Sequence, residues 1–128
     1  MKVVRGIRGA ITVARDEREE IQKASLELFT SILIENGLSP EDVVGVFITA
    51  TPDIRAAFPA EVIREQESFR YIPILCAQEM DVEGALKQCI RMLVLAYTSR
   101  NPQEIRHVYL RNACILRKDL MEEKGEKE

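Results

Sequence analysis

The sequence predicts an α+β domain in which two long helices cover one face of a mixed β-sheet. Strand-like and helix-like patterns follow each other in the order strand, helix, strand, turn, strand, helix, strand, and no repeat or linker interrupts them. A chain of 128 residues also fits one domain, which at this size buries about two-thirds of its unfolded surface. We therefore expect a single domain over residues 1–120, followed by a flexible charged tail over residues 121–128.

The first predicted strand, around VVRGIRGA, carries an arginine among small neighbours. Strand alternation places Arg8 on one face with Gly6 and Ala10, and sends Ile7 and Ile11 to the other face. Room around a guanidinium indicates either a solvated edge or a hollow where an anion docks. The segment alone leaves both interpretations open.

The first predicted helix begins where Asp16 and Glu19 match a capping box and ends at Asn36-Gly37. Residues 39–42 predict a single capped turn, and VVGVFITA (43–50) predicts a strand that is apolar on both faces. Residues 51–68 contain two prolines and predict an irregular loop with one or two helical turns.

The second half of the chain predicts a strand, a long helix and a last strand. RYIPILC (70–76) is the strand, and Pro73 favours an edge or an irregular position. Asp81 is placed to cap a helix over 82–97, and HVYLRNACIL (107–116) supplies the last strand. The inner stripe of that helix is predicted at Leu86, Cys89, Ile90, Leu93 and Tyr97. Because both helices fit on one face of the sheet, we expect a second copy of the chain to cover the other face.

Composition excludes several classes of protein. The net charge of −3 disfavours nucleic-acid binding, and no apolar run is long enough to span a membrane. Three widely spaced cysteines favour neither a disulfide framework nor a zinc knuckle, so we expect a cytoplasmic protein. A single histidine, His107, excludes a cluster of imidazole ligands, and no phosphate-binding glycine motif or GxSxG elbow is present. We expect no metal ion, no nucleotide cofactor and no covalent nucleophile.

The remaining candidates are polar side chains near the ends of predicted elements. Arg8, Arg64, Arg91 and Arg117 are the arginines of interest, and arginine suits bidentate contacts with carboxylates. Arg91 is predicted on the second helix without an acidic partner one turn away, which also fits a surface arginine that extends its head group into water. Taken singly, Glu79 fits a solvated glutamate and Cys76 a small core residue, so their roles stay open.

Four segments together resemble a known family. They are RGIRGAITV, TATPDIRAAFPAEVIR, YIPILCAQEMDVEGALKQCIR and IRHVYLRNACILRKDL, in this order and at compatible spacing from Val3 to Leu120. The chain is similar to the AroH-class monofunctional chorismate mutases. This resemblance implies a homotrimer of ferredoxin-like β-α-β-β-α-β subunits that assemble as a pseudo-α/β-barrel, with active sites between neighbouring subunits. It also implies the cofactor-free Claisen rearrangement of chorismate to prephenate, in phenylalanine and tyrosine biosynthesis.

The resemblance implies a role for each matched residue. Arg8 and Tyr109 would hold the enolpyruvyl carboxylate, and Arg91 would donate to the ether oxygen and touch the same carboxylate. Glu79 and Cys76 would bind the ring hydroxyl.

Four further residues would enclose the ligand. Phe58 and Arg64 would come from the adjacent subunit, with Arg64 near the ring carboxylate, and Leu116 and Arg117 would close over the ligand. Two positions depart from the family pattern: Glu61 stands where lysine is expected, and Leu75 where threonine is expected. These departures put in doubt an electrostatic attraction at the entrance and one hydroxyl contact.

Two other functions remain compatible with the sequence. A trimeric module that binds a carboxylated metabolite without catalysis needs Arg8 and Arg64 but no donor at an ether oxygen. Imine or enamine deamination on a similar trimer also uses an arginine for the substrate carboxylate, but gives no reason for the FPAEVIR and CAQEMD segments.

Overall fold

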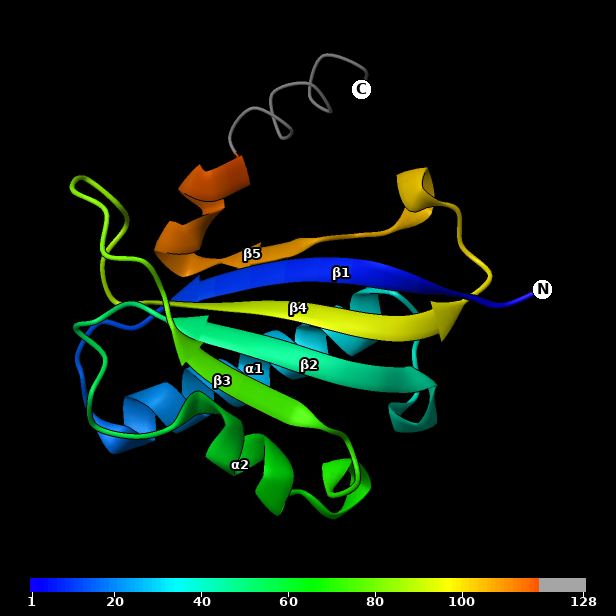
Figure 1. Ribbon diagram of the computed structural model, residues 1–128, viewed down its shortest axis with the longest axis horizontal. Coiled ribbons are helices and arrows are strands. Elements are labelled where there is room, and N and C mark those ends of the chain that lie inside the picture. The colour runs from blue at the N-terminus through cyan, green and yellow to red at the C-terminus, as the bar shows by residue number, and fades with distance from the viewer. Residues whose placement is uncertain (118–128) are drawn as a thin grey trace.

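The computed structural model describes residues 1–117 and shows one five-stranded mixed sheet with a long helix across one face (Figure 1). The strands lie in the order β3-β2-β4-β1-β5. The elements are β1 (Val3–Thr12), α1 (Arg18–Glu35), β2 (Val43–Ala50), α2 (Pro59–Glu65), β3 (Ile74–Gln78), β4 (Cys89–Thr98), β5 (Val108–Leu110) and the 3₁₀ segment η4 (Arg111–Arg117). The α+β class is confirmed, and no helix among these residues is long and apolar enough to cross a lipid bilayer.

The prediction of a second long helix over 82–97 is wrong, because most of this segment is strand β4. Its apolar residues follow a period of two: Ile90, Met92, Val94 and Ala96 are all buried, and the residues between them are more exposed. The helix-like stripe arose because several of the alternate positions, such as Leu93 and Tyr97, are also apolar. With one long helix and a fifth strand, the order differs from the ferredoxin-like β-α-β-β-α-β order in its second half.

The core lies between the sheet and α1. Ile21, Leu28, Phe29 and Ile32 are fully buried on the inner side of α1, as its predicted stripe requires. The helix sits close to β1 at Gly9, where an added Cβ would lie 2.7 Å from Ile32 Cδ1. A glycine at this position therefore sets the distance between helix and sheet.

The predicted capping box of α1 is wrong. The helix begins at Arg18 with Glu17 as its N-cap, and no side chain caps it. Asp16 instead accepts hydrogen bonds from the backbone N–H groups of Arg55 and Ala56, at 2.9 and 3.0 Å. The carboxylate thus fixes the loop before α2 rather than the helix. The capped turn at 39–42 is confirmed, with a capping box between Ser39 and Asp42.

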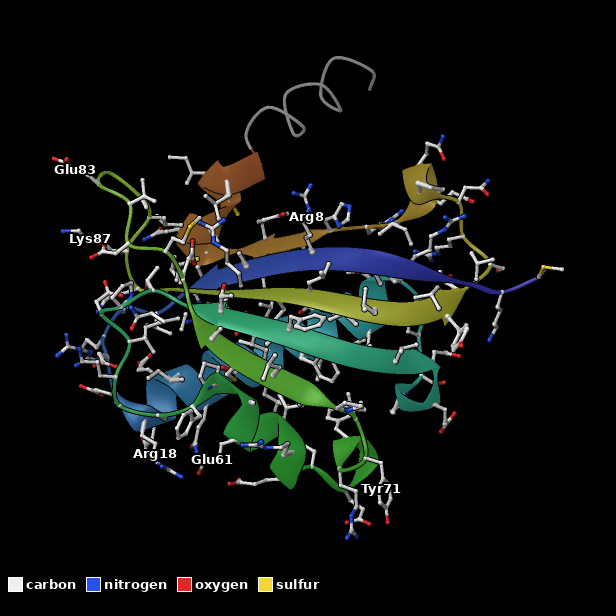
Figure 2. All side chains as sticks on the ribbon, in the orientation of Figure 1. Arg8, Arg18, Glu61, Tyr71, Glu83 and Lys87 are labelled. Carbon is white, nitrogen blue, oxygen red and sulfur yellow. The ribbon has the colours of Figure 1, made fainter. Side chains whose placement is uncertain are left out.

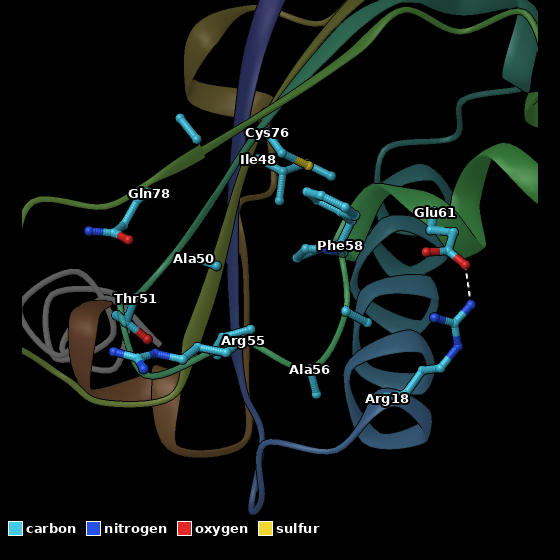
Figure 3. A pocket seen from close by; sticks show the side chains of 14 residues that line it. Arg18, Ile48, Ala50, Thr51, Arg55, Ala56, Phe58, Glu61, Cys76 and Gln78 are labelled. Atoms are coloured by element: carbon cyan, nitrogen blue, oxygen red, sulfur yellow. Dashed lines mark hydrogen bonds and ion pairs between the residues drawn. The ribbon is translucent and has the colours of Figure 1, made fainter.

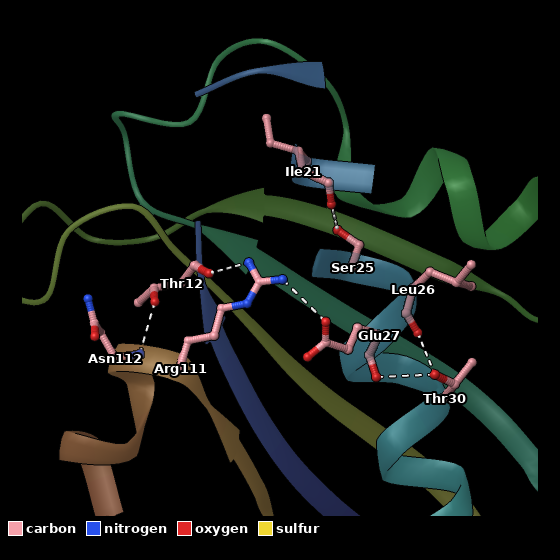
Figure 4. Close-up of polar contacts among 8 residues, drawn as sticks. All are labelled: Thr12, Ile21, Ser25, Leu26, Glu27, Thr30, Arg111 and Asn112. Atoms are coloured by element: carbon pink, nitrogen blue, oxygen red, sulfur yellow. Dashed lines mark hydrogen bonds and ion pairs between the residues drawn. The ribbon is translucent and has the colours of Figure 1, made fainter. Parts of the chain in front are cut away.

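The edges of the sheet are short. β3 is an edge strand, which confirms the interpretation of Pro73, although the strand begins only at Ile74. The last strand ends at Leu110 rather than continuing to residue 116, because Arg111 has a positive φ of 55° and begins η4. The Arg111 guanidinium donates to Thr12 O at 3.1 Å and to Glu27 Oε1 at 3.2 Å, which ties η4 to β1 and α1 (Figure 4). The predicted tail over 121–128 lies outside the described residues.

No α-helix among residues 1–117 covers the face of the sheet opposite α1, which we call the open face (Figure 1). Apolar side chains lie there on four neighbouring strands: Val4, Phe47, Leu75, Leu93 and Tyr97 are 37–62% exposed. The prediction that residues 43–50 are apolar on both faces is thereby confirmed.

Candidate active site

Three of the predicted site residues line one cavity of about 350 Å³ on the open face. Arg8, Arg91 and Tyr109 come from the three strands β1, β4 and β5. On β2, Phe47 adds an apolar side chain to the wall of the cavity and Thr49 adds a polar one. The sequence pattern predicts Arg91 on a helix, whereas in the structure it lies on β4, and this brings the three side chains together.

Strand register explains the grouping. Ala10 of β1 pairs with Arg91 on one side and with Tyr109 on the other, and Thr49 of β2 pairs with Arg91. Directly paired residues point to the same face of a sheet, so these four side chains form one row. Arg8 lies two residues along β1 on the same face. The small side chain of Ala10 leaves space between Arg91 and Tyr109.

Arg91 carries an acidic neighbour in this row. Glu79 follows the end of β3, and its Oε1 lies 2.9 Å from Arg91 Nε, but the pair does not meet the geometry of a hydrogen bond. Arg91 Nε and Glu79 Oε2 are both buried without a hydrogen-bond partner among the described residues. Buried polar atoms are rarely left unpaired in native proteins, and leaving one unpaired costs about 1–3 kcal/mol. The Arg91–Glu79 ion pair therefore leaves part of the hydrogen-bonding capacity of both side chains unused.

The backbone of Arg8 is fixed by the only histidine of the sequence. The backbone N–H of Arg8 donates to His107 Nδ1 at 2.9 Å. The two residues stand directly before Gly9 and Val108, the first residues that pair between β1 and β5. The Arg8 side chain is exposed and projects beside β5 (Figure 2). His107 was singled out in the sequence only as a lone histidine, and nothing there indicated this contact.

Phe58 and Cys76 line a second cavity, of about 440 Å³ (Figure 3). Cys76 pairs with Ile48, which is buried on the side of α1, so Cys76 faces away from Arg91. Phe58 precedes α2 and is 68% exposed. Glu61, one of the two departures from the family pattern, forms an ion pair with Arg18 at this cavity.

The remaining predicted residues line neither of these two cavities. Arg64 is exposed in the last turn of α2, and Leu75, the second departure, is 62% exposed on the open face. Leu116 packs against a small buried cluster of Ala10, Cys89 and Ala113, which places it close to the Arg91 row. Arg117 ends η4.

Cys89 is a fully buried thiol two residues before Arg91. Burial raises the pKa of its thiol to about 11, against the opposing influence of the positive charge of Arg91. The thiol is therefore protonated at neutral pH. Among residues 1–117, no three His, Cys, Asp or Glu side chains lie close enough together to hold a metal ion.

Comparison with known proteins identifies the family. A family model described as chorismate mutase type I matches residues 4–120. The chain belongs to the chorismate mutase type I family. It is 48% identical over 118 residues to the chorismate mutase AroH of Bacillus subtilis (strain 168), a match covering 92% of this chain and 93% of that protein. It is 46% identical over 119 residues to the chorismate mutase AroH of Thermus thermophilus, covering 92% and 97%.

A solved chorismate mutase has the same fold. The chorismate mutase from Clostridium thermocellum superposes with a TM-score of 0.83 at 34% sequence identity, covering 87% of this chain and 98% of that one. The mixed sheet with its single long helix is therefore also found in that chorismate mutase.

Proposed function

We propose that this protein is a chorismate mutase that converts chorismate to prephenate for aromatic amino acid biosynthesis. Membership of the chorismate mutase type I family supports this, and one structural observation carries it. Arg8, Arg91 and Tyr109 line a single cavity, and Arg91 forms an ion pair with Glu79 across 2.9 Å. Two guanidinium groups in one cavity suit a side chain that carries both a carboxylate and an ether oxygen.

The reaction is an intramolecular isomerisation. The ether C–O bond breaks, a C–C bond forms between the side chain and the ring, and no atom enters or leaves. Because the C–O bond breaks ahead of C–C formation, negative charge develops on the ether oxygen and positive charge spreads over the ring. A fixed positive donor at that oxygen lowers the barrier, since it binds the transition state more strongly than the substrate.

Arg91 is the donor to the ether oxygen in this mechanism. It also touches the enolpyruvyl carboxylate, which Arg8 and Tyr109 hold so that the side chain folds over the ring. Glu79 binds the ring hydroxyl and its charge stabilises the positive ring. The ion pair across 2.9 Å keeps Glu79 and Arg91 within reach of opposite parts of the same ligand.

We further propose that the site is completed between the subunits of a homotrimer. The apolar row Leu75, Phe47 and Leu93 runs across the open face to Arg8, so a second copy that covers it also approaches the cavity. A neighbouring copy that contributes Phe58 brings Cys76 with it, because both line one cavity.

Arg64, Leu116 and Arg117 complete the proposed enclosure. In the same assembly Arg64 reaches the ring carboxylate from the neighbouring copy, and Leu116 and Arg117 close over the ligand. The single domain over residues 1–120 is the unit of this assembly. Because Arg18 neutralises Glu61, the departure at Glu61 adds little repulsion toward an anionic substrate.

Loss of the ultraviolet absorbance of chorismate, followed with the purified protein, tests the proposal. We expect saturable conversion, with prephenate identified as the product by NMR. Arg91→Ala serves as the control for a contaminating enzyme, because the variant copurifies with the same contaminants. Binding of chorismate without conversion would instead identify a non-catalytic carboxylate-binding module and refute the proposal.

A further inference from the structure

The two charges of the Arg91–Glu79 pair flank a long exposed segment. Glu79 follows β3, Arg91 lies near the start of β4, and residues 80–88 connect the two strands without helix or strand structure. Glu83 and Lys87 project from this segment beyond the end of the sheet (Figure 2). Most of the connecting segment is exposed, and the contacts that bear on the spacing between Glu79 and Arg91 lie at its two ends.

The end of β2 ties both strands together. Glu79 N–H donates to Ala50 O at 2.9 Å. Thr51 N–H donates to Cys89 O at 3.0 Å, and Cys89 N–H donates to the Thr51 hydroxyl oxygen at 2.9 Å. Residues 50 and 51 thus hold the last residue before the connection and the first residue of β4.

Asp53 completes this arrangement at the start of β4. Its two carboxylate oxygens accept the Gln88 N–H at 3.0 and 3.2 Å, and Oδ1 also accepts the Thr51 hydroxyl at 2.5 Å. Gln88 has a positive φ of 48°, a conformation that side chains other than glycine rarely adopt and that surrounding contacts must enforce. The Gln88 carbonyl accepts the Val13 N–H at 2.9 Å, so both backbone groups of this residue are held.

We propose that Asp53 is a positioning residue for Arg91. The Asp53 carboxylate holds Gln88 and Thr51, and these two residues fix the backbone at the start of β4. Arg91 projects from this backbone three residues after Gln88. Asp53 does not line the cavity of Arg8, Arg91 and Tyr109, so it acts through the backbone rather than on the substrate. The inference rests on the proposed function, because it assigns Asp53 a part in placing the donor to the ether oxygen.

Asp53→Asn tests the inference with little change of shape. Both carboxylate oxygens accept from the Gln88 N–H, at 3.0 and 3.2 Å, so replacing either oxygen by an amide NH2 group sets a donor against this N–H. We expect kcat to fall about tenfold and KM to change less than twofold, since a donor misplaced in the transition state lowers kcat. Asp42→Asn is the matched control: Asp42 accepts the Ser39 N–H at 2.9 Å before the opposite end of β2, and its loss should leave kcat within twofold.

A double-mutant cycle separates positioning from general destabilisation. If Asp53 acts through Arg91, Asp53→Asn lowers kcat little further in the Arg91→Ala background. Equal losses of kcat in both backgrounds would overturn the proposal, as would wild-type kcat in the single variant.

A second readout does not depend on turnover. The amide protons of Gln88 and Cys89 should exchange with solvent at least tenfold faster in Asp53→Asn, whereas unchanged exchange rates contradict the inference. An inactive wild-type protein would refute the proposed function. The exchange rates would then still decide whether Asp53 fixes the start of β4.

Discussion

Phe47→Ala tests whether the open face is covered by other copies of the chain. Phe47 is 48% exposed at the centre of this face, between Leu75 and Leu93. A phenylalanine side chain buries about 150–250 Å², so about 100 Å² of Phe47 stays available to a neighbour. At about 25 cal/mol per Å², burial of that area is worth about 2 kcal/mol in each copy once the retained Cβ is allowed for. For three copies the loss is about 6 kcal/mol, or roughly 10⁴-fold in the association constant of a trimer.

Sedimentation equilibrium over a range of protein concentrations measures this loss. We expect the wild-type protein to remain trimeric at protein concentrations at which the Phe47→Ala variant dissociates into monomers. Ile34→Ala is the control, because Ile34 is 79% exposed on α1 and its truncation should leave the association constant unchanged. A wild-type protein that stays monomeric throughout, or equal effects of the two substitutions, would refute the reasoning.

Two further predictions concern stability. Gly9→Ala should lower the free energy of unfolding in urea by about 1–3 kcal/mol, because its Cβ would meet Ile32 Cδ1 at 2.7 Å and Val108 O at 3.1 Å. Gly6→Ala is the control, because its Cβ would meet only the ends of the Leu93 and Leu95 side chains, at 3.3 and 3.8 Å. It should change the free energy of unfolding by less than about 0.5 kcal/mol. Equal losses of stability in the two variants would contradict this account of Gly9. Burial raises the pKa of Cys89 from 9.0 to about 11, so the folded state keeps a proton that the unfolded state releases in this range. Stability should therefore fall more steeply between pH 9 and 11 in the wild type than in Cys89→Ala, and parallel pH profiles would show that the thiol does not contribute.

The sequence predicted the parts of the fold that carry a clear local signal. The inner stripe of α1 and the Asn36-Gly37 end are strong helix signals, and Pro73 correctly marked an edge strand. The apolar character of residues 43–50 on both faces also correctly indicated a face that the chain itself leaves open.

The second half of the fold was missed because β4 is apolar on both faces. Residues 89–98 match a helical stripe as well as an alternating strand, and only the surrounding sheet decides between them. The Asp16 capping box was wrong for a similar reason: the carboxylate has two backbone donors from residues distant in sequence, Arg55 and Ala56, which no local pattern reveals.

The grouping of the candidate site residues depends on the register between neighbouring strands, which no local sequence pattern reveals. Motif resemblance supplied Arg8, Arg91 and Tyr109 as separate residues, but their common face follows from strand register, in which Ala10 pairs with both Arg91 and Tyr109. The support from His107 and Asp53 was missed entirely, because both act through backbone N–H groups of residues far away in the chain.

The most direct test of the central claim is the kcat of Arg91→Ala, measured on protein whose oligomeric state and fold match the wild type. Loss of one preorganised donor to a developing negative charge typically costs 10²- to 10³-fold in kcat. We expect a fall of at least a hundredfold. A kcat close to that of the wild type would show that the guanidinium beside Glu79 does not stabilise the rearranging ether.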